Sequence, residues 1–330
     1  MLTQSTRIFV AGHRGLVGSA ILRGLQMAGH TNLLTRTRAE LDLTDRKAVR
    51  VFFRESRPQH VILAAAKVGG IVANANFPAD FIRENLQIQT NVIEAAFEVG
   101  VERLLFLGSS CIYPKFAPQP IKEEYLLTGP LERTNRPYAL AKIAGIEMCW
   151  SYNRQHGTRY LAAMPTNLYG PNDNFHPEHS HVIPALVRRF VHARMEGAME
   201  VEVWGSGKPF REFLHSDDLA AACLYLMGLD EPAFDALLGT DSDDQFAPPL
   251  INIGSGGDVS ISELAHMIAK AAGFQGKIRF DASKPDGTPK KLMDSSRLFG
   301  LGWRPRIELQ QGLEQVVEAY GQMVGSSAGQ

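Results

Sequence analysis

The sequence predicts an α/β fold in which a doubly wound parallel sheet is followed by a smaller C-terminal α/β domain. Three observations favour this fold class. A short apolar run passes through glycines into a helix at the start of the chain, apolar runs then alternate with helical segments as far as residue 164, and a further strand and helix follow within 250–272. With 330 residues and 45% hydrophobic content, the chain can bury one large core or two smaller ones.

The first predicted strand, 7–11, runs into a glycine-rich turn and then into a helix over 19–27. The turn reads Gly12-His13-Arg14-Gly15-Leu16-Val17-Gly18. Glycines at this spacing allow a tight turn, the approach of a pyrophosphate to the backbone at a helix N-terminus, and close packing of helix on strand. The order of strand, glycine turn and helix therefore predicts a Rossmann-type dinucleotide site. The alternative is a turn that serves packing alone.

The second predicted strand, 31–35, ends where a dinucleotide fold usually places an acid for the ribose hydroxyls. Arg36 and Arg38 stand there instead, and Arg14 lies in the glycine turn. Because guanidinium groups suit a ribose 2′-phosphate, the sequence favours NADP(H) over NAD. The alternative is a solvated charge cluster, with Glu40 or Asp42 as the acid.

Three further strands are predicted at 60–66, 104–108 and 160–164, with a helix around 86–99. Ligands bind outside the carboxyl ends of such strands, at the switch point of the sheet. Ser109, Ser110 and Cys111 directly follow the fourth strand, and they are therefore candidates for contact with a substrate. The alternative is that the serines satisfy loop backbone and that the cysteine is a buried apolar residue.

Tyr138 and Lys142 lie one helical turn apart on one face of a predicted helix, a spacing that no other of the 8 tyrosines has with a lysine. Lowering a tyrosine pKa from about 10 to about 7 takes roughly 4 kcal/mol, and one positive charge at about 4 Å supplies about that much. The sequence therefore predicts that Lys142 lowers the pKa of Tyr138 for proton transfer. The alternative is a surface tyrosine beside a solvated lysine.

The C-terminal half carries three histidines within six positions, His176, His179 and His181. A metal site is disfavoured here, because the segment contains a proline and no cysteine and its histidines lack helical spacing. The sequence favours one histidine as a proton-transfer group, and the alternative is that all three are solvated loop residues. The other expected elements are a helix at 182–194, a strand and turn at 201–207, a helix capped by Ser216 or Asp217, an exposed loop at 230–249, a strand at 250–254, a helix at 261–272 and a frayed tail at 321–330.

The composition excludes several classes of protein. A net charge of -1 gives no basic surplus for nucleic acid or an anionic membrane. Cys111, Cys149 and Cys223 are odd in number and widely spaced, which indicates reduced thiols in the cytoplasm. No apolar run reaches membrane length, and no secretory leader is recognisable. We therefore expect a cytoplasmic protein with no nucleic-acid, membrane or metal partner.

Five motifs, taken in order along the chain, resemble the extended short-chain dehydrogenases that act on nucleotide sugars. They are the glycine turn 12–18, Ser109-Ser110-Cys111, Tyr138 with Lys142, Pro165-Thr166-Asn167-Leu168-Tyr169-Gly170 and His215-Ser216-Asp217-Asp218. Four longer strings, 64–71, 108–115, 174–184 and 284–289, are similar to the GDP-L-fucose synthase family in particular. The resemblance covers nearly the whole chain.

The resemblance implies the conversion of GDP-4-keto-6-deoxy-D-mannose to GDP-L-fucose, by epimerisation at C3 and C5 followed by NADPH-dependent reduction at C4. It implies that Tyr138 donates a proton to the C4 oxygen, that Ser109 stabilises the oxyanion, and that Lys142 tunes Tyr138 and holds the nicotinamide ribose. Cys111 and His181 match the acid/base positions of epimerisation, with the two roles left open. Cys111 replaces the Ser or Thr usual in the superfamily, and this departure indicates an epimerase step.

The same resemblance implies two sets of binding residues. The NADP(H) contacts are Gly12, His13, Arg14, Gly15, Leu16, Val17, Gly18, Arg38, Leu107, Gly108, Ser109, Ser110, Lys142, Pro165, Thr166, Asn167, Leu168 and His181. The GDP-sugar contacts are Arg189, Trp204, Arg211, Asp286 and Lys291. For Trp204 a place in the core is the alternative, and for Lys291 a solvated charge.

The implied organisation is an NADP-binding domain of residues 1–175 and 212–256, interleaved with a substrate-binding domain of residues 176–211 and 257–330, in a homodimer. One alternative function is another nucleotide-sugar 4-epimerase, 4,6-dehydratase or reductase of the same family. A different class is a regulator that senses NADP without turnover. That class commonly lacks the Tyr/Lys pair, so Tyr138 and Lys142 count against it.

Overall fold

The structure is a computed structural model that describes residues 2–177, 180–242, 245–284 and 286–327. Its largest sheet has the strand order β11-β5-β4-β3-β1-β2, and every neighbouring pair is parallel. The strands are β1 (Ile8–Ala11), β2 (Leu33–Leu34), β3 (His60–Leu63), β4 (Arg103–Leu107), β5 (Tyr160–Pro165) and β11 (Leu250–Ile253). The chain leaves β1 for β2 on one side and returns for β3 on the other, which places the switch point between β1 and β3. This sheet confirms the predicted fold class.

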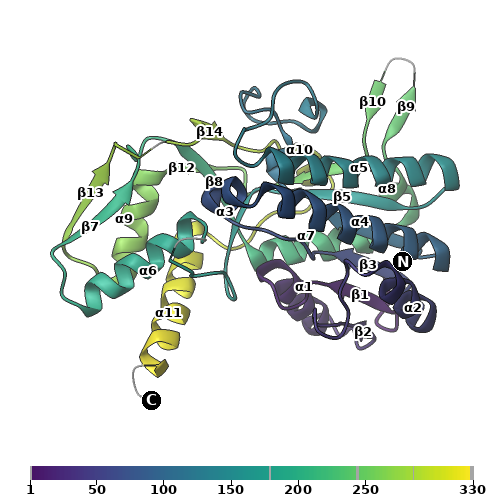
Figure 1. Ribbon diagram of the computed structural model, residues 1–330, viewed down its shortest axis with the longest axis horizontal. Helices are drawn as coiled ribbons and strands as arrows, with labels where there is room; N and C mark the ends of the chain where they lie inside the picture. Colours follow the sequence, from purple (N-terminus) through teal and green to yellow (C-terminus); the bar gives the residue numbers. More distant parts are fainter. Residues whose placement is uncertain (1, 178–179, 243–244, 285, 328–330) are drawn as a thin grey trace.

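Helices cover both faces of the large sheet (Figure 1). On one face lie α2 (Arg46–Ser56), α4 (Pro78–Val99) and α5 (Arg136–His156), and on the other lie α1 (Leu16–Met27) and α7 (Ser216–Gly228). All four residues of β1 are buried, because Phe9 and Ala11 face the first set of helices while Ile8 and Val10 face the second.

A second group of elements, at the left of Figure 1, has its own apolar cluster. Its helices are α6 (Val182–Met195), α9 (Ile261–Ala272) and α11 (Leu309–Ser327), beside the parallel pair β7 (Glu200–Trp204) and β13 (Lys277–Asp281). A four-stranded sheet is built from β6 (Asn167–Tyr169), β8 (Phe210–His215), β12 (Asp258–Ser260) and β14 (Lys290–Lys291). The helix α10 (Ser296–Gly300) and Trp303 return to the core of the large sheet.

Three local expectations were wrong. The cap of α7 is His215, whose side chain accepts the Asp217 backbone N–H. Within 230–249 the chain forms α8 (Glu231–Asp235) and the pair β9 (Thr240–Ser242) and β10 (Gln245–Ala247), because Phe234 is fully buried and anchors the helix. The tail does not fray at 321, since α11 continues to Ser327.

Other short elements are α3 (Ile71–Asn76), η1 (Ser110–Ile112) and η2 (Glu123–Tyr125). Helix α9 has its predicted bounds, and a capping box between Ser260 and Glu263 fixes its start. In the described part of the chain, none of the helices has the length and apolar character needed to cross a membrane. The same residues contain no group of three His, Cys, Asp or Glu side chains that could hold a metal ion.

Candidate active site

The glycine turn connects β1 to α1 at the switch point of the sheet. Gly12 has φ +87°, and a Cβ there would lie 2.8 Å from the Ala65 backbone. A Cβ on Gly18 would lie 2.1 Å from the Gly12 carbonyl oxygen, so both positions need glycine for packing. At Gly15, which caps α1, the nearest atom to such a Cβ is 3.6 Å away. Space therefore remains open at Gly15, where a pyrophosphate would approach the helix N-terminus.

Lys142 reaches from α5 to the carboxyl end of β4. Its Nζ donates a hydrogen bond to the Leu107 carbonyl oxygen at 2.7 Å and lies 4.7 Å from the centre of the Phe106 ring. The side chain is buried, and burial lowers the pKa of Lys142 from 10.5 to about 7. A neutral amine and an ammonium are therefore both accessible to Lys142 near neutral pH.

Tyr138 precedes Lys142 by one turn, and its pKa moves in the opposite direction from the sequence-based expectation. Burial raises the pKa of Tyr138 above its ordinary value, while a hydrogen bond with Ser109 opposes the rise. The expectation was wrong in direction because it counted the charge of Lys142 and not the loss of water around the phenol. Tyr138 consequently keeps its proton at neutral pH, as a proton donor must.

Cys111 lies in η1, directly after β4, beside both residues of the Tyr/Lys pair. The Ser109 hydroxyl donates to Cys111 Sγ at 3.2 Å, and the Cys111 backbone N–H donates to Ser109 Oγ at 3.3 Å. Negative charge on Cys111 contributes to the raised pKa of Tyr138 and opposes the lowered pKa of Lys142. The fold therefore gathers Ser109, Cys111, Tyr138 and Lys142 at one edge of the sheet.

Lys291 joins this group from a distant part of the sequence. It lies on β14, in register with Arg211 on β8. Burial lowers the pKa of Lys291, and the charge of Cys111 opposes that shift. Lys291 is half-buried, whereas Lys290 is 44% exposed and pairs with Asp258 at 3.1 Å. Of the two adjacent lysines, Lys290 is the more solvated, and Lys291 is close enough to Cys111 for their charges to interact.

His181 is the N-cap residue of α6, and its ring remains accessible to solvent. The protein atoms around it desolvate the ring enough to lower the pKa of His181. The described residues show no hydrogen bond or ion pair between His181 and either Cys111 or Tyr138. His179 lies outside the described residues, so the pairing of a histidine with Cys111 stays a prediction.

The predicted GDP-sugar contacts lie on α6, β7, β8 and β14 and in the loop before β14. Arg189 donates to the Glu202 carbonyl oxygen at 3.0 Å, and its guanidinium lies 5.0 Å from the centre of the Trp204 ring. Trp204 is 55% exposed, which excludes a core position. Arg189 and Trp204 help to line a cavity of about 310 Å³.

Asp286 and Arg211 complete the set of predicted GDP-sugar contacts. Asp286 accepts hydrogen bonds from the backbone N–H and the hydroxyl of Ser206, at 2.9 and 2.6 Å. Burial lowers the pKa of Arg211, and the charge of Asp286 opposes that shift. Arg211 is therefore a partly desolvated cation, which favours pairing with an anionic ligand.

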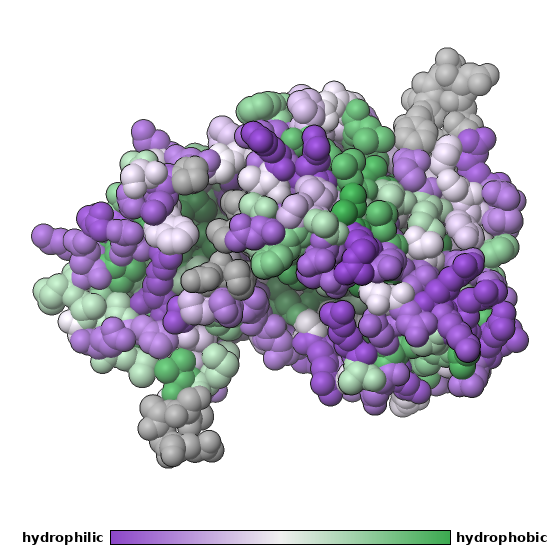
Figure 2. Space-filling model, in the orientation of Figure 1, coloured by the Kyte–Doolittle hydropathy of each residue, from purple (hydrophilic) through white to green (hydrophobic). Residues whose placement is uncertain are grey.

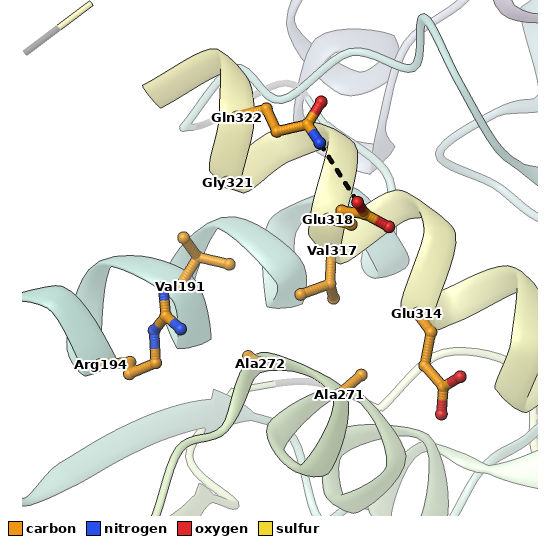
Figure 3. Close-up of a pocket in the computed structure, with 9 residues that line it drawn as sticks. All are labelled: Val191, Arg194, Ala271, Ala272, Glu314, Val317, Glu318, Gly321 and Gln322. Carbon is orange, nitrogen blue, oxygen red and sulfur yellow. Dashed lines mark hydrogen bonds between the residues drawn. The ribbon is translucent and has the colours of Figure 1, made fainter. Parts of the chain in front are cut away.

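A larger cavity of about 380 Å³ lies between α6, α9 and α11 (Figure 3). Its described lining includes Arg194 and Glu318 around the apolar side chains of Val191 and Val317, and it contains none of the predicted site residues. Gln322 donates to Glu318 at 3.2 Å on its rim. The catalytic candidates thus lie at the strand ends and not in this cavity.

The remaining predicted cofactor residues lie at the ends of β2 and β5. Arg38 is 76% exposed, and its Nη2 lies 3.7 Å from Glu84 Oε2. Pro165 and Thr166 are buried at the end of β5, and Asn167 donates to the Glu212 carbonyl oxygen at 2.8 Å. These positions surround the same edge of the large sheet as the glycine turn.

A buried polar network around Asn252 on β11 was missed from the sequence. The Tyr113 hydroxyl donates to Asn252 Oδ1 at 2.6 Å, and the Asn252 backbone N–H donates to Glu123 Oε1 at 3.0 Å. Asn252 Nδ2 also donates to the Ile121 carbonyl oxygen at 2.9 Å. The sequence does contain a signal for this network, because Asn252 is a polar residue inside an otherwise apolar strand. A buried amide requires hydrogen-bond partners, so partners for Asn252 could have been expected.

Comparison with known proteins now gives the family. Residues 8–234 match the NAD dependent epimerase/dehydratase family. The chain belongs to this family.

Relatives within the epimerase/dehydratase family match almost the full chain. A putative GDP-L-fucose synthase 2 of Arabidopsis thaliana is 60% identical, over 97% of this chain and 93% of the relative. The GDP-L-fucose synthase of Escherichia coli K12 is 57% identical, over 93% of this chain and 94% of the relative. A solved GDP-mannoheptose C4 reductase from Campylobacter jejuni with NADP bound has 41% identity and a TM-score of 0.87, covering 97% of this chain and 99% of that chain.

Proposed function

We propose that the protein converts GDP-4-keto-6-deoxy-D-mannose to GDP-L-fucose, by epimerisation at C3 and C5 and reduction at C4 with NADPH. The observation that carries the proposal is the convergence of Ser109, Cys111, Tyr138 and Lys142 at the end of β4. A reductase needs the Ser, Tyr and Lys of this set, and a thiol beside them adds a group for proton exchange. The GDP-L-fucose synthases that match nearly the full chain support the assignment.

In the reduction step, Tyr138 donates its proton to the C4 oxygen as that oxygen becomes an alkoxide. The raised pKa of Tyr138 keeps the donor protonated, and Ser109 supplies a second hydrogen bond to the same oxygen. Lys142 is held at the Leu107 carbonyl oxygen, where it would hold the nicotinamide ribose of a bound cofactor. When bound, NADPH supplies the hydride that reduces C4.

In the epimerisation steps, the C4 carbonyl acidifies the hydrogens on C3 and C5. One group removes a proton to give an enolate, and a second group returns a proton on the opposite face, so that the carbon is inverted with no net change of atoms. We assign these two roles to Cys111 and His181, because a thiol and an imidazole can each remove a proton and return one. Lys291 lies close enough to Cys111 for the charges of the two groups to interact.

The chain offers suitable groups for both phosphorylated ligands. Arg189 and Arg211, with Lys291, supply positive charge for the diphosphate of the GDP-sugar, while Trp204 supplies an exposed ring and Asp286 a hydrogen-bond acceptor. For the cofactor, the open space at Gly15 accommodates a pyrophosphate, and the exposed Arg38 with Arg14 suits a 2′-phosphate. The solved relative with NADP bound supports NADP(H).

Incubation of the purified protein with NADPH and the 4-keto sugar nucleotide tests the reaction. We expect loss of nicotinamide absorbance at 1:1 stoichiometry with product, and incorporation of solvent deuterium at both C3 and C5. Persistence of NADPH with a substrate that a known synthase consumes would exclude the reductase. Reduction without deuterium incorporation would instead indicate a simple C4 reductase.

The proposal includes a cytoplasmic homodimer with the interleaved domains 1–175 plus 212–256 and 176–211 plus 257–330. The free thiols of Cys111, Cys149 and Cys223 support a reducing compartment. Figure 2 shows apolar residues gathered over α4 and α5, where Phe97 is 37% exposed and Leu140 is 41% exposed. A second copy of the chain would cover this face.

Light scattering tests the homodimer. We expect a mass of twice 36.3 kDa for the native chain and a shift toward the monomer when Phe97 and Leu140 are both replaced by Asp. The matched control replaces Met27, which is 89% exposed on α1, by Asp. A native chain of monomeric mass would exclude the homodimer.

A further inference from the structure

Arg38, which we propose to hold the 2′-phosphate, shares a carboxylate with a lysine that has no role in the proposed reaction. Arg38 Nη2 lies 3.7 Å from Glu84 Oε2 on α4, and Lys67 Nζ lies 2.7 Å from Glu84 Oε1. The Glu84 side chain is only 13% exposed. This largely buried anion is therefore shared by a cation from the segment after β2 and a cation from the segment after β3, with Arg83 of α4 as a third cation at 3.7 Å.

Lys67 is fixed beside Glu84 by contacts of its own backbone. Its N–H donates to Asn85 Oδ1 at 3.0 Å, and Asn85 Nδ2 donates to the Lys67 carbonyl oxygen at 3.0 Å. The ammonium also lies 3.7 Å from Asp80 Oδ2 and 5.9 Å from the centre of the Phe81 ring. Because Glu84 is only 13% exposed and Lys67 30% exposed, their ion pair is less screened by water than an ordinary surface ion pair.

The charge of Glu84 matters when a phosphate approaches Arg38. A ribose 2′-phosphate carries close to two negative charges at neutral pH, and it competes with Glu84 for the same guanidinium. An uncompensated Glu84 would both retain Arg38 and repel the phosphate. Lys67 is the cation nearest to Glu84, at 2.7 Å and 30% exposed, whereas Arg38 and Arg83 both lie 3.7 Å away and are more exposed. Lys67 therefore supplies the largest share of the charge that neutralises Glu84.

We propose that the Lys67–Glu84 ion pair sets the preference for a 2′-phosphorylated cofactor, by releasing Arg38 to the phosphate. Lys67 and Glu84 act through Arg38 and are positioning residues. The inference rests on the proposed use of NADPH, and it predicts that the two residues are coupled: removing Lys67 matters only while Glu84 is charged.

The test measures binding of adenosine 2′,5′-bisphosphate and of 5′-AMP by calorimetry at low salt, so that no turnover is needed. We expect Lys67→Met to reduce the preference for the bisphosphate about fivefold and to leave AMP binding within about twofold. Lys67→Arg should retain the preference. Glu84→Gln should retain or strengthen it, and adding Lys67→Met to Glu84→Gln should produce no further loss.

The matched control is Lys277→Met, which removes one exposed positive charge on β13, in the second group of elements. An unchanged preference in Lys67→Met would overturn the inference, and so would an equal loss in the Glu84→Gln background, because Lys67 would then act without Glu84. Equal affinity of the native protein for the two nucleotides is a distinct result, which excludes the NADPH proposal and this inference with it. The Lys67→Met effect should also shrink at high salt.

Discussion

Lys142 illustrates how much one residue depends on its surroundings. The side chain is buried against the Phe106 ring and the Leu107 carbonyl oxygen, and burial lowers its pKa to about 7. In the unfolded chain the same amine has a pKa near 10.5. Between these two values the unfolded state binds more protons, so this group makes the free energy of unfolding rise with pH.

We therefore expect Lys142→Met to be more stable than the native protein below pH 7. The advantage should shrink as the pH rises from 7 to about 10, by about 1.4 kcal/mol for each unit of pKa depression, because the native amine is then neutral in the folded state. Urea unfolding of both proteins across this range measures the difference. An advantage independent of pH would show that Lys142 is not desolvated as an ammonium.

Single substitutions test whether Tyr138 serves the reduction and Cys111 the epimerisation. Tyr138→Phe should reduce hydride transfer by about 10²–10⁴-fold, since it removes the proton donor, while exchange of solvent deuterium beside the ketone continues. Cys111→Ser should block that exchange while the cofactor still binds. If Tyr138→Phe lost both hydride transfer and deuterium exchange while binding the cofactor normally, this assignment of roles would be contradicted.

At the scale of elements, the glycine turn contains residues with different tasks. A Cβ on Gly18 would meet the Gly12 carbonyl oxygen at 2.1 Å, so α1 would have to move away from β1. A Cβ on Gly15 meets nothing closer than 3.6 Å, and Gly15 has an ordinary extended backbone with φ -78°. Packing thus depends on Gly18, and ligand access on Gly15.

We expect Gly18→Ala to lower the free energy of unfolding by about 1–3 kcal/mol. Gly15→Ala should change it by less than about 1 kcal/mol and yet weaken NADPH binding, because the methyl group occupies the approach of the pyrophosphate. Thermal unfolding and cofactor titration of the two variants separate the effects. Full cofactor affinity in Gly15→Ala would show that the pyrophosphate does not approach this turn.

Across the whole molecule, Glu212 links the large sheet to the second group of elements. It is fully buried on β8, and its carboxylate accepts the backbone N–H groups of Gly256 and Met293 at 2.9 and 3.0 Å. Gly256 follows β11 of the large sheet, and Met293 follows β14. Burial raises the pKa of Glu212, which shows the cost of holding this carboxylate away from water.

We expect Glu212→Ala to destabilise the protein by about 2–5 kcal/mol, because it leaves a cavity and removes the acceptor of two N–H donors, of which that of Met293 is buried. Glu200→Ala is the control. Glu200 is 49% exposed and pairs with Arg279 at 2.8 Å, so its loss should cost less than about 1 kcal/mol. Chemical denaturation measures the free energy of unfolding of both variants. A similar small decrease in the two would show that Glu212 does not join the large sheet to the second group of elements.

The sequence by itself determined the features that depend on neighbours along the chain. Local periodicity predicted the glycine turn between β1 and α1, the alternation of strands and helices in the large sheet, and the start of α9 at Ile261. The candidate residues at the end of β4 were found for the same reason, because strand ends and helical spacing are visible in sequence.

Only the tertiary structure decided the features that depend on burial and on distant partners. The pKa of Tyr138 rises because side chains from other elements exclude water, and no spacing along α5 records that. Lys291 comes close enough to Cys111 for their charges to interact, across 180 residues of chain, and Glu84 joins Arg38 to Lys67. Desolvation and charge pairing act through space, so the pattern of residues alone cannot fix them.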